Sequence, residues 1–269
     1  MADQRNGGIA WCEETWNPVR GCSRVSEGCR HCYAERVAAR FSGPGKPYEG
    51  LAVMKSDGPH WTGKVRLVAA ALDLPLRWRK PRRIFVNSMS DLFHKGLTDH
   101  EILKVFVTMA RARQHTFQIL TKQPRRMLEW FLVCADDTVR PLAWAGVPWP
   151  LPNVWLGVSV EDQETADERI PLLLQTPAAV RWVSAEPLLG PIEFPTMLRN
   201  WIDWLVVGGE SGPGARPMHP DWARGLRDQC VAAGVPFFMK QGSKANWSDF
   251  KNFESFPADL RIREYPDAR

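Results

Sequence analysis

Apolar runs alternate with amphipathic stretches along most of the chain. Six β-rich runs that end in polar residues occur at 83–91, 116–122, 153–161, 180–186, 202–210 and 235–241. Helical periodicity follows at 98–113, 124–131, 165–174 and 221–233. Such alternation is typical of parallel βα units with helices on the outside. With a further strand at 15–19, the pattern predicts an α/β fold: a complete or partial (β/α) TIM-type barrel of about six or seven parallel strands. A doubly wound open sheet is the alternative.

Several segments fall outside this repeat. Residues 42–63 are rich in Gly and Pro and show neither helical nor strand period, so they predict a loop insertion, as do residues 134–152. Residues 65–78 predict a helix, and the extension 243–269 is expected to pack over the barrel. The whole chain, 1–269, is therefore predicted to be a single domain.

Polar residues stand at the carboxyl end of each predicted strand. In a parallel barrel these ends meet at one rim, where active sites are built. A polar pair at one strand end is readily explained as a helix cap, but the same feature at six strands favours a site. The six strands end in Asn87, Ser88, Ser90 and Asp91; Thr121 and Lys122; Ser159 and Glu161; Ser184 and Glu186; Gly208, Gly209, Glu210 and Ser211; and Lys240 and Gln241.

Three cysteines, Cys22, Cys29 and Cys32, lie within eleven residues directly after the first predicted strand. Three thiolates can hold an iron–sulfur cube and leave one iron free for a substrate or cofactor. A structural zinc site is the alternative, because Cys29-x-x-Cys32 is a zinc-site spacing and Cys12 or His31 could add a ligand. A disulfide framework is disfavoured, since six cysteines in 269 residues are sparse.

A helical pattern follows the cysteines directly. Ala34, Val37, Ala38 and Phe41 are spaced to share one face of that helix. The cysteine loop therefore lies between a strand and a helix, on the same rim as the polar strand ends.

Charge and hydropathy bear on the partners and the location of the protein. The net charge of +5 is compatible with a nucleic-acid partner, and the basic run at 77–83 is a candidate phosphate-contacting patch. No apolar run is long enough to span a bilayer, and the first residues do not form a signal peptide. We therefore expect a cytoplasmic protein without a membrane partner.

Together, these segments resemble a known family. TWNP…GC…GC..CYA, FVNSMSDLFH, ILTKQP, GVSVE, SAEPLL and GGESG resemble a phage-associated, radical-SAM-like family that usually has no assigned function. A more distant similarity is to spore photoproduct lyase, a radical enzyme that acts on a nucleobase. The usual superfamily loop has three residues between its first two cysteines, whereas six separate Cys22 from Cys29 here.

The resemblance implies a barrel of the radical SAM kind and a function. Cys22, Cys29 and Cys32 would bind a [4Fe–4S] cluster, and S-adenosyl-L-methionine would be cleaved to a 5′-deoxyadenosyl radical that abstracts hydrogen from a substrate. The substrate is expected to be a modified nucleobase or nucleotide in phage DNA, rearranged or modified by an isomerase, lyase or nucleobase-modifying activity. An external one-electron reductant is the other expected partner.

By position, the resemblance also implies candidate contacts. Candidates for cofactor binding are His31, Tyr33, Asn87, Ser88, Ser90, Lys122, Ser159, Glu161, Ser184 and Glu186. Candidates for substrate binding are Asp91, His94, Gly209, Glu210, Trp61 and Trp144. Two other functions stay open: a zinc-stabilised nucleic-acid-binding module without catalysis, and a radical SAM enzyme that acts on a peptide or small metabolite.

Overall fold

The computed structural model describes residues 9–135, 147–194 and 201–267, so Trp144 lies outside the described residues. The chain divides into two compact units. Unit 1 comprises Met1–Val25, Cys32–Trp155 and Thr176–Ala179, and unit 2 comprises Ser26–His31, Leu156–Gln175 and Val180–Arg269. Whether the chain behaves as one domain stays a prediction. None of the described helices is long and apolar enough to cross a membrane.

The main strands follow the order β1-β6-β7-β8-β9-β10-β11 in one seven-stranded sheet. Their bounds are β1 (Glu14–Trp16), β6 (Arg83–Val86), β7 (Thr116–Thr121), β8 (Val154–Val160), β9 (Val180–Ala185), β10 (Trp204–Gly208) and β11 (Phe237–Gln241). The order is open, with β1 and β11 at its ends. The α/β prediction is therefore confirmed in the form of a partial barrel of parallel strands.

In unit 1, β1, β6 and β7 pair in parallel, with Phe85 opposite Gln118. Helices α4 (Asp99–Arg111) and α5 (Pro124–Ala135) follow β6 and β7 close to the predicted positions. A capping box begins α4. The Thr98 hydroxyl accepts from the Glu101 amide, and the Glu101 carboxylate accepts from the Thr98 amide. The aromatic core of this unit is formed by Phe93, Phe106, Trp130, Phe131 and Trp149.

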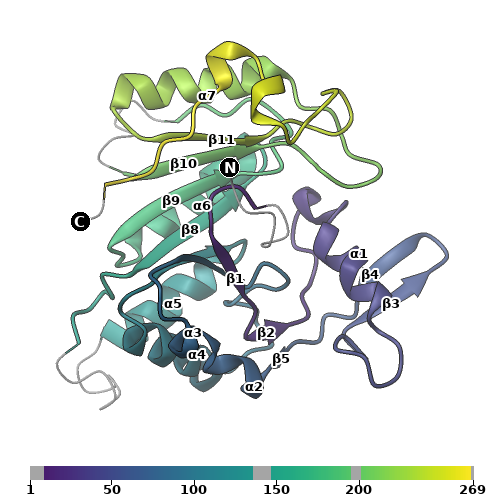
Figure 1. Cartoon of the computed structure of the whole chain (residues 1–269), viewed down its shortest axis with the longest axis vertical. Helices are drawn as coiled ribbons and strands as arrows, with labels where there is room; N and C mark the ends of the chain where they lie inside the picture. Colours follow the sequence, from purple (N-terminus) through teal and green to yellow (C-terminus); the bar gives the residue numbers. More distant parts are fainter. Residues whose placement is uncertain (1–8, 136–146, 195–200, 268–269) are drawn as a thin grey trace. The chain divides into compact units, whose positions relative to one another are not determined.

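In unit 2, β9, β10 and β11 pair in parallel, with helices α6 (Gln163–Gln175) and α7 (Pro220–Ala233). Proline at the first position of α7 and Gly234 in the left-handed region (φ 64°) set its two ends. The last described residues run beside β11, where Arg263 bridges to Phe238. Figure 1 shows α7 and this terminal segment alongside β10 and β11.

Two predictions in unit 1 were wrong. Residues 42–63 contain an antiparallel hairpin, β3 (Ala52–Lys55) and β4 (Gly58–Trp61), which has no alternating pattern because most of its side chains are partly or fully exposed. Residues 65–78 form β5 (Arg66–Leu67), paired with β2 (Val19–Arg20), and then two short helices, α2 (Ala69–Leu72) and α3 (Leu74–Arg77). A single helix fails because Pro75, the second residue of α3, has no amide hydrogen to continue the hydrogen bonds of α2.

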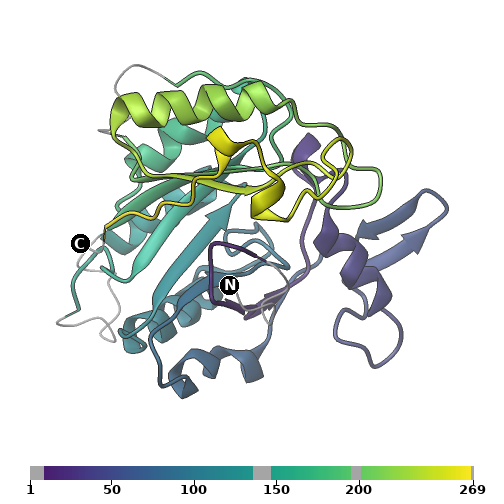
Figure 2. The same ribbon diagram turned by 45° about the horizontal axis from the view of Figure 1, so that its top comes forward.

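The helix after the cysteine loop, α1 (Tyr33–Arg40), forms as predicted but with a different buried face. It buries Ala34, Glu35 and Ala38, whereas Val37 and Phe41 are 37% and 48% exposed. The small side chain of Ala38 joins Tyr48, Leu51 and Ala52 in a separate small core. Figure 2 shows α1 lying beside the β3–β4 hairpin.

Candidate metal and cofactor site

The first part of the cysteine loop, in unit 1, is held by the residues that follow β6. Asn87 lies in the left-handed region (φ 63°), which asparagine tolerates better than most residues, and its Oδ1 accepts from the Val19 amide at 3.3 Å. The Ser90 hydroxyl donates to the Val19 carbonyl at 3.0 Å, and Ser90 forms a parallel bridge with Gly21. The backbone leading to Cys22 is therefore fixed by two of the predicted strand-end residues.

Ser88 and His94 extend this support. The Ser88 hydroxyl donates to Asn17 Oδ1 at 3.2 Å, and its carbonyl accepts from Tyr33 Oη at 2.7 Å. His94 is buried, and its Nδ1 accepts from the Gly96 amide at 3.0 Å. Nδ1 is therefore unprotonated, so in the neutral ring Nε2 carries the hydrogen and donates to Ser23 Oγ at 2.8 Å. Burial lowers the pKa of His94, with Asp91 acting in the opposite direction.

Asp91 joins the ends of β6 and β7. Its carboxylate accepts from the Thr121 hydroxyl at 2.7 and 3.0 Å and from the amides of Phe93 and Lys122, each at 2.9 Å. The side chain is buried and its oxygens are occupied by these donors. The structure thus places Asp91 in a strand-to-strand link.

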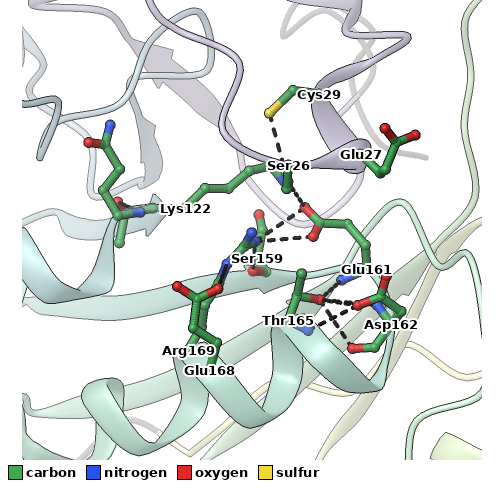
Figure 3. A network of polar contacts seen from close by, with 12 residues as sticks. Ser26, Glu27, Cys29, Lys122, Ser159, Glu161, Asp162, Thr165, Glu168 and Arg169 are labelled. Carbon is green, nitrogen blue, oxygen red and sulfur yellow. Dashed lines mark hydrogen bonds and ion pairs between the residues drawn. The ribbon is translucent and has the colours of Figure 1, made fainter.

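The middle of the cysteine loop, in unit 2, is held by Glu161 at the end of β8. Ser26 Oγ donates to Glu161 Oε1 at 2.9 Å (Figure 3). Arg169 of α6 lies 3.2 Å from the same carboxylate and donates to the Ser159 carbonyl at 2.7 Å. Glu161 is fully buried and Arg169 is 3% exposed. Because an unpaired buried carboxylate is strongly unfavourable, Arg169 allows Glu161 to be charged where it meets the loop.

Gly28 and Cys29 complete this contact. A Cβ on residue 28 would overlap the Glu161 carboxylate, so the loop backbone reaches the carboxylate only because this residue is glycine. Cys29 Sγ lies 4.0 Å from Ser26 Oγ. Since the one hydroxyl hydrogen of Ser26 is donated to Glu161, the Ser26 oxygen is left to accept from the Cys29 thiol.

A second arginine holds the same part of the loop. Arg216 donates to the Glu27 carbonyl at 2.8 Å and to Glu27 Oε2 at 3.2 Å. Its guanidinium also binds Glu210, which follows β10, and Glu210 Oε2 accepts from the Arg216 amide at 2.7 Å. Nearby, a Cβ on residue 214 would lie 3.2 Å from His31 Nδ1, so the glycine there leaves room for the His31 ring. Glu210 therefore orients the arginine that binds the cysteine loop.

The other candidate residues of unit 2, Gly209, Glu186 and Ser184, have partners other than the cysteine loop or have none among the described residues. Gly209 exchanges two hydrogen bonds with Gln241, and a Cβ there would lie 2.6 Å from the Ser243 nitrogen. Glu186 forms an ion pair with Lys240. Ser184 Oγ is buried and has no hydrogen-bond partner within the described part of the chain.

In unit 1, Trp61 lies in the β3–β4 hairpin rather than on a loop. Its amide donates to Glu35 at 2.6 Å, and its ring packs on Tyr48 at 6.3 Å between centroids. In the basic run, Arg82 pairs with Glu14 at 2.6 Å and Arg83 with Glu13 at 3.7 Å, both beside β1. Arg77, Arg79 and Lys80 are exposed, and their role as a phosphate-contacting patch stays a prediction.

All six cysteines are free. Cys12, Cys134 and Cys230 are buried, and burial raises the pKa of Cys134 to about 11 and that of Cys230 to about 12. These last two stay protonated at neutral pH and are poor nucleophiles and metal ligands.

The three loop cysteines, Cys22, Cys29 and Cys32, are partly exposed. Three accessible thiols fit an iron–sulfur cluster by the chemistry of the donor set. Within residues 9–135, 147–194 and 201–267, no three His, Cys, Asp or Glu side chains are gathered closely enough to hold a metal ion. The assignment of these cysteines as ligands stays a prediction.

Sequence reasoning missed Ser26, Gly28, Arg169 and Arg216. A signal for Arg169 exists: with Ala166, Ile170 and Leu173 it occupies the buried stripe of α6, where an arginine needs a buried anionic partner. Arg216 lies in a glycine-rich loop after β10 and carries no comparable pattern.

The fold and the loop define a parallel α/β protein with a partial barrel and a cysteine-bearing loop after its first strand. The chain belongs to the family described as "Protein of unknown function (DUF5131)", whose family model matches residues 6–257.

Among solved structures, the chain is similar to a spore photoproduct lyase mutant with bound AdoMet and dinucleoside spore photoproduct. That similarity has a TM-score of 0.40 and 11% identity, and it covers 84% of this chain and 64% of the lyase chain. No curated protein matches the sequence.

Proposed function

We propose that this protein is a radical S-adenosylmethionine enzyme in which Cys22, Cys29 and Cys32 hold a [4Fe–4S] cluster. One observation carries the proposal: the strand-end acids Glu161 and Glu210 are both used to hold the segment that bears Cys29. Glu161 does so through Ser26, and Glu210 does so through Arg216. A buried ion pair and a bidentate arginine are costly supports for a loop without a role. The motif resemblance supports the same function.

When bound, the cluster supplies a reducing electron and a free iron position, and S-adenosylmethionine supplies the radical precursor. The chain's own residues position this group. The Ser26 hydroxyl donates its hydrogen to Glu161, so it holds the loop to β8 and does not donate to the Cys29 sulfur. Arg216 holds the neighbouring backbone at Glu27. Together these contacts fix the position of Cys29 along the loop.

We assign the cofactor contacts to the polar residues at the ends of β7 and β9. Lys122 remains the candidate for the methionine carboxylate. Ser184, whose buried hydroxyl lacks a partner within the described residues, is a candidate for a ribose or amino contact. Glu186, two residues after Ser184 and just past the end of β9, pairs with Lys240 of β11 and would orient that contact. The substrate we propose is a nucleobase, rearranged or modified after loss of a hydrogen atom.

Iron analysis tests the proposal. Protein reconstituted without oxygen should contain about four irons per chain and should cleave S-adenosylmethionine when given a one-electron reductant. Alanine at Cys22, Cys29 or Cys32 should abolish both properties, whereas Cys12→Ala should keep them. One tightly bound zinc with no iron, lost as fully in Cys12→Ala as in Cys29→Ala, would instead support a zinc-stabilised binding module.

A further inference from the structure

Helix α1 exposes its larger apolar side chains and buries its small ones. Tyr33, Val37 and Phe41 follow one another at intervals of four residues and are 45%, 37% and 48% exposed. Residues four apart lie on one side of a helix, so these side chains form a continuous stripe. An amphipathic helix normally turns such residues toward the core. The exposed stripe therefore calls for a partner.

The side of α1 that carries Ala38 is packed against other residues of unit 1, which fixes the position of the helix. Ala38 packs with Tyr48, Leu51 and Ala52 in the small core between α1 and the β3–β4 hairpin. The hairpin adds Met54, which is 60% exposed. At the start of α1, the Tyr33 hydroxyl is bound to the Ser88 carbonyl, so the ring is held in place. The small core joins α1 to the β3–β4 hairpin, which lies beside it in Figure 2, and this packed pair presents the apolar side chains.

The part of unit 1 that contains α1 and the β3–β4 hairpin has the same net positive charge as the whole chain. The unit 1 residues 20–25 and 32–66 contain eight basic side chains (Arg20, Arg24, Arg36, Arg40, Lys46, Lys55, Lys64 and Arg66) and three acidic ones (Glu35, Glu49 and Asp57). The difference, 8 − 3 = +5, equals the net charge of all 269 residues. The remainder of the sequence is therefore neutral overall.

The acidic side chains of this segment are engaged by nearby groups. Glu35 is buried against Arg24, Asp57 binds His60, and Glu49 accepts from the Gly45 amide. By contrast, six basic side chains are exposed: Arg24, which pairs with Glu35, and Arg40, Lys46, Lys55, Lys64 and Arg66. The surface around the stripe is therefore positive and is suited to a polyanion.

We propose that the α1 and β3–β4 surface binds single-stranded nucleic acid. Its phosphates would be neutralised by side chains such as Arg40, Lys46 and Lys55, and its bases would stack on Tyr33 and Phe41. A duplex keeps its base faces stacked and would leave the apolar stripe uncovered. A second copy of the chain would bring two positive surfaces together, which is unfavourable.

This inference deepens the proposed function by naming what presents the substrate, yet it rests on unit 1 side chains that do not include a proposed cluster ligand. Binding can therefore be measured on protein with and without iron. The probe is a labelled single strand of about 16 nucleotides, read by fluorescence anisotropy across a salt series. Cys29→Ala should bind the strand as the parent protein does. If the protein holds no cluster but still binds the strand, only the cluster proposal fails. If it holds a cluster but does not bind the strand, only the proposal of a nucleic-acid-binding surface fails.

Two sets of variants test the surface. Phe41→Ser should weaken binding by about 5-fold to 150-fold, because one stacked base contributes roughly 1–3 kcal/mol. Arg40→Gln with Lys55→Gln should lower the slope of log affinity against log salt by about 0.7 for each phosphate that is no longer neutralised. The matched controls Leu132→Ser, 58% exposed on α5, and Arg111→Gln, exposed at the end of α4, should leave binding unchanged.

Four results would overturn the proposal. The first is no binding at low salt, and the second is binding that Phe41→Ser and the double charge variant leave intact. The third is tighter binding to anionic vesicles than to the strand, which would assign the surface to a membrane. The fourth is self-association that Phe41→Ser abolishes in the absence of strand binding, which would assign it to a second copy.

Discussion

The Cα of Gly28 lies against the carboxylate of Glu161 with no room for a methyl group between them. Glu161 is itself fully buried and ion-paired to Arg169. The backbone immediately before Cys29 therefore rests on a charged group at the end of β8. A glycine at this position sets the height of the loop above the strand.

Gly28→Ala should move the loop away from Glu161. Its φ is not in the left-handed region, so alanine is allowed by the backbone and the penalty is purely steric. We expect a loss of stability of about 1–3 kcal/mol together with reduced iron loading. Urea unfolding and iron analysis would measure both.

The control is the same substitution at Gly225 in α7, where a Cβ would meet nothing within 4 Å. Alanine there should stabilise the helix slightly. Equal iron loading in Gly28→Ala and the parent protein would contradict the proposed role of the contact.

Arg169→Met should be among the most destabilising single changes in unit 2. It leaves the buried Glu161 carboxylate without its cation, which typically costs about 3–5 kcal/mol. The midpoint of urea unfolding should therefore fall well below that of the parent. Arg111→Met, at an exposed position of α4, should change stability by no more than about 0.5 kcal/mol. Similar midpoints for the two variants would show that Glu161 does not depend on Arg169.

His94 should make the protein less stable under mildly acidic conditions. Because burial lowers its pKa in the folded state, the unfolded chain takes up a proton first as the pH falls through about 6.5. The free energy of unfolding should then decrease with falling pH, by at most about 1.4 kcal/mol per pH unit from this group.

In His94→Asn, the side-chain carbonyl can still accept from the Gly96 amide, but the titrating ring is gone. The slope of stability against pH between about 6.5 and 5 should therefore become shallower. His100→Asn, on the exposed side of α4, controls for removal of an imidazole. An unchanged slope in His94→Asn would rule out His94 as the source.

Native alkylation should separate the cysteines into two groups. With a pKa of about 11, Cys134 has a thiolate fraction of roughly one in a thousand at pH 8, and Cys230 has less still. Cys22, Cys29 and Cys32 are partly exposed and should be labelled first in metal-free protein. Mass spectrometry after a timed iodoacetamide pulse would give the order. Labelling of Cys230 as fast as Cys29 would contradict it.

The parallel strands and their helices were predictable because each carries a strong periodic signal. Runs such as Val154–Val160 are buried along their whole length, which is what a strand covered on both faces requires. The β3–β4 hairpin was missed because strands that expose side chains on both faces have no hydrophobic alternation to detect. In α1, the expected face failed because packing selected Ala34 and Ala38 over the larger Val37 and Phe41.

For the site, position along the chain indicated which strand ends matter but not what each side chain binds. Glu161, Asp91 and Glu210 come at strand ends, as expected, and each has its carboxylate occupied by other residues of the chain. Those partners depend on distances between segments far apart in sequence, such as Ser26 and Glu161. No local pattern encodes such distances, so the supporting role of these acids emerges only in three dimensions.

In unit 1 the cysteine loop is bonded to Asn87, Ser90 and His94, and in unit 2 it is bonded to Glu161 and Arg216. Because the chain's own residues make these bonds, we expect folding to order the loop backbone before a ligand is captured. Loading and release at the three thiols should then leave these backbone bonds intact. Amide hydrogens such as that of Val19, which is bonded to Asn87, should then exchange with solvent at the same slow rate before and after chelation.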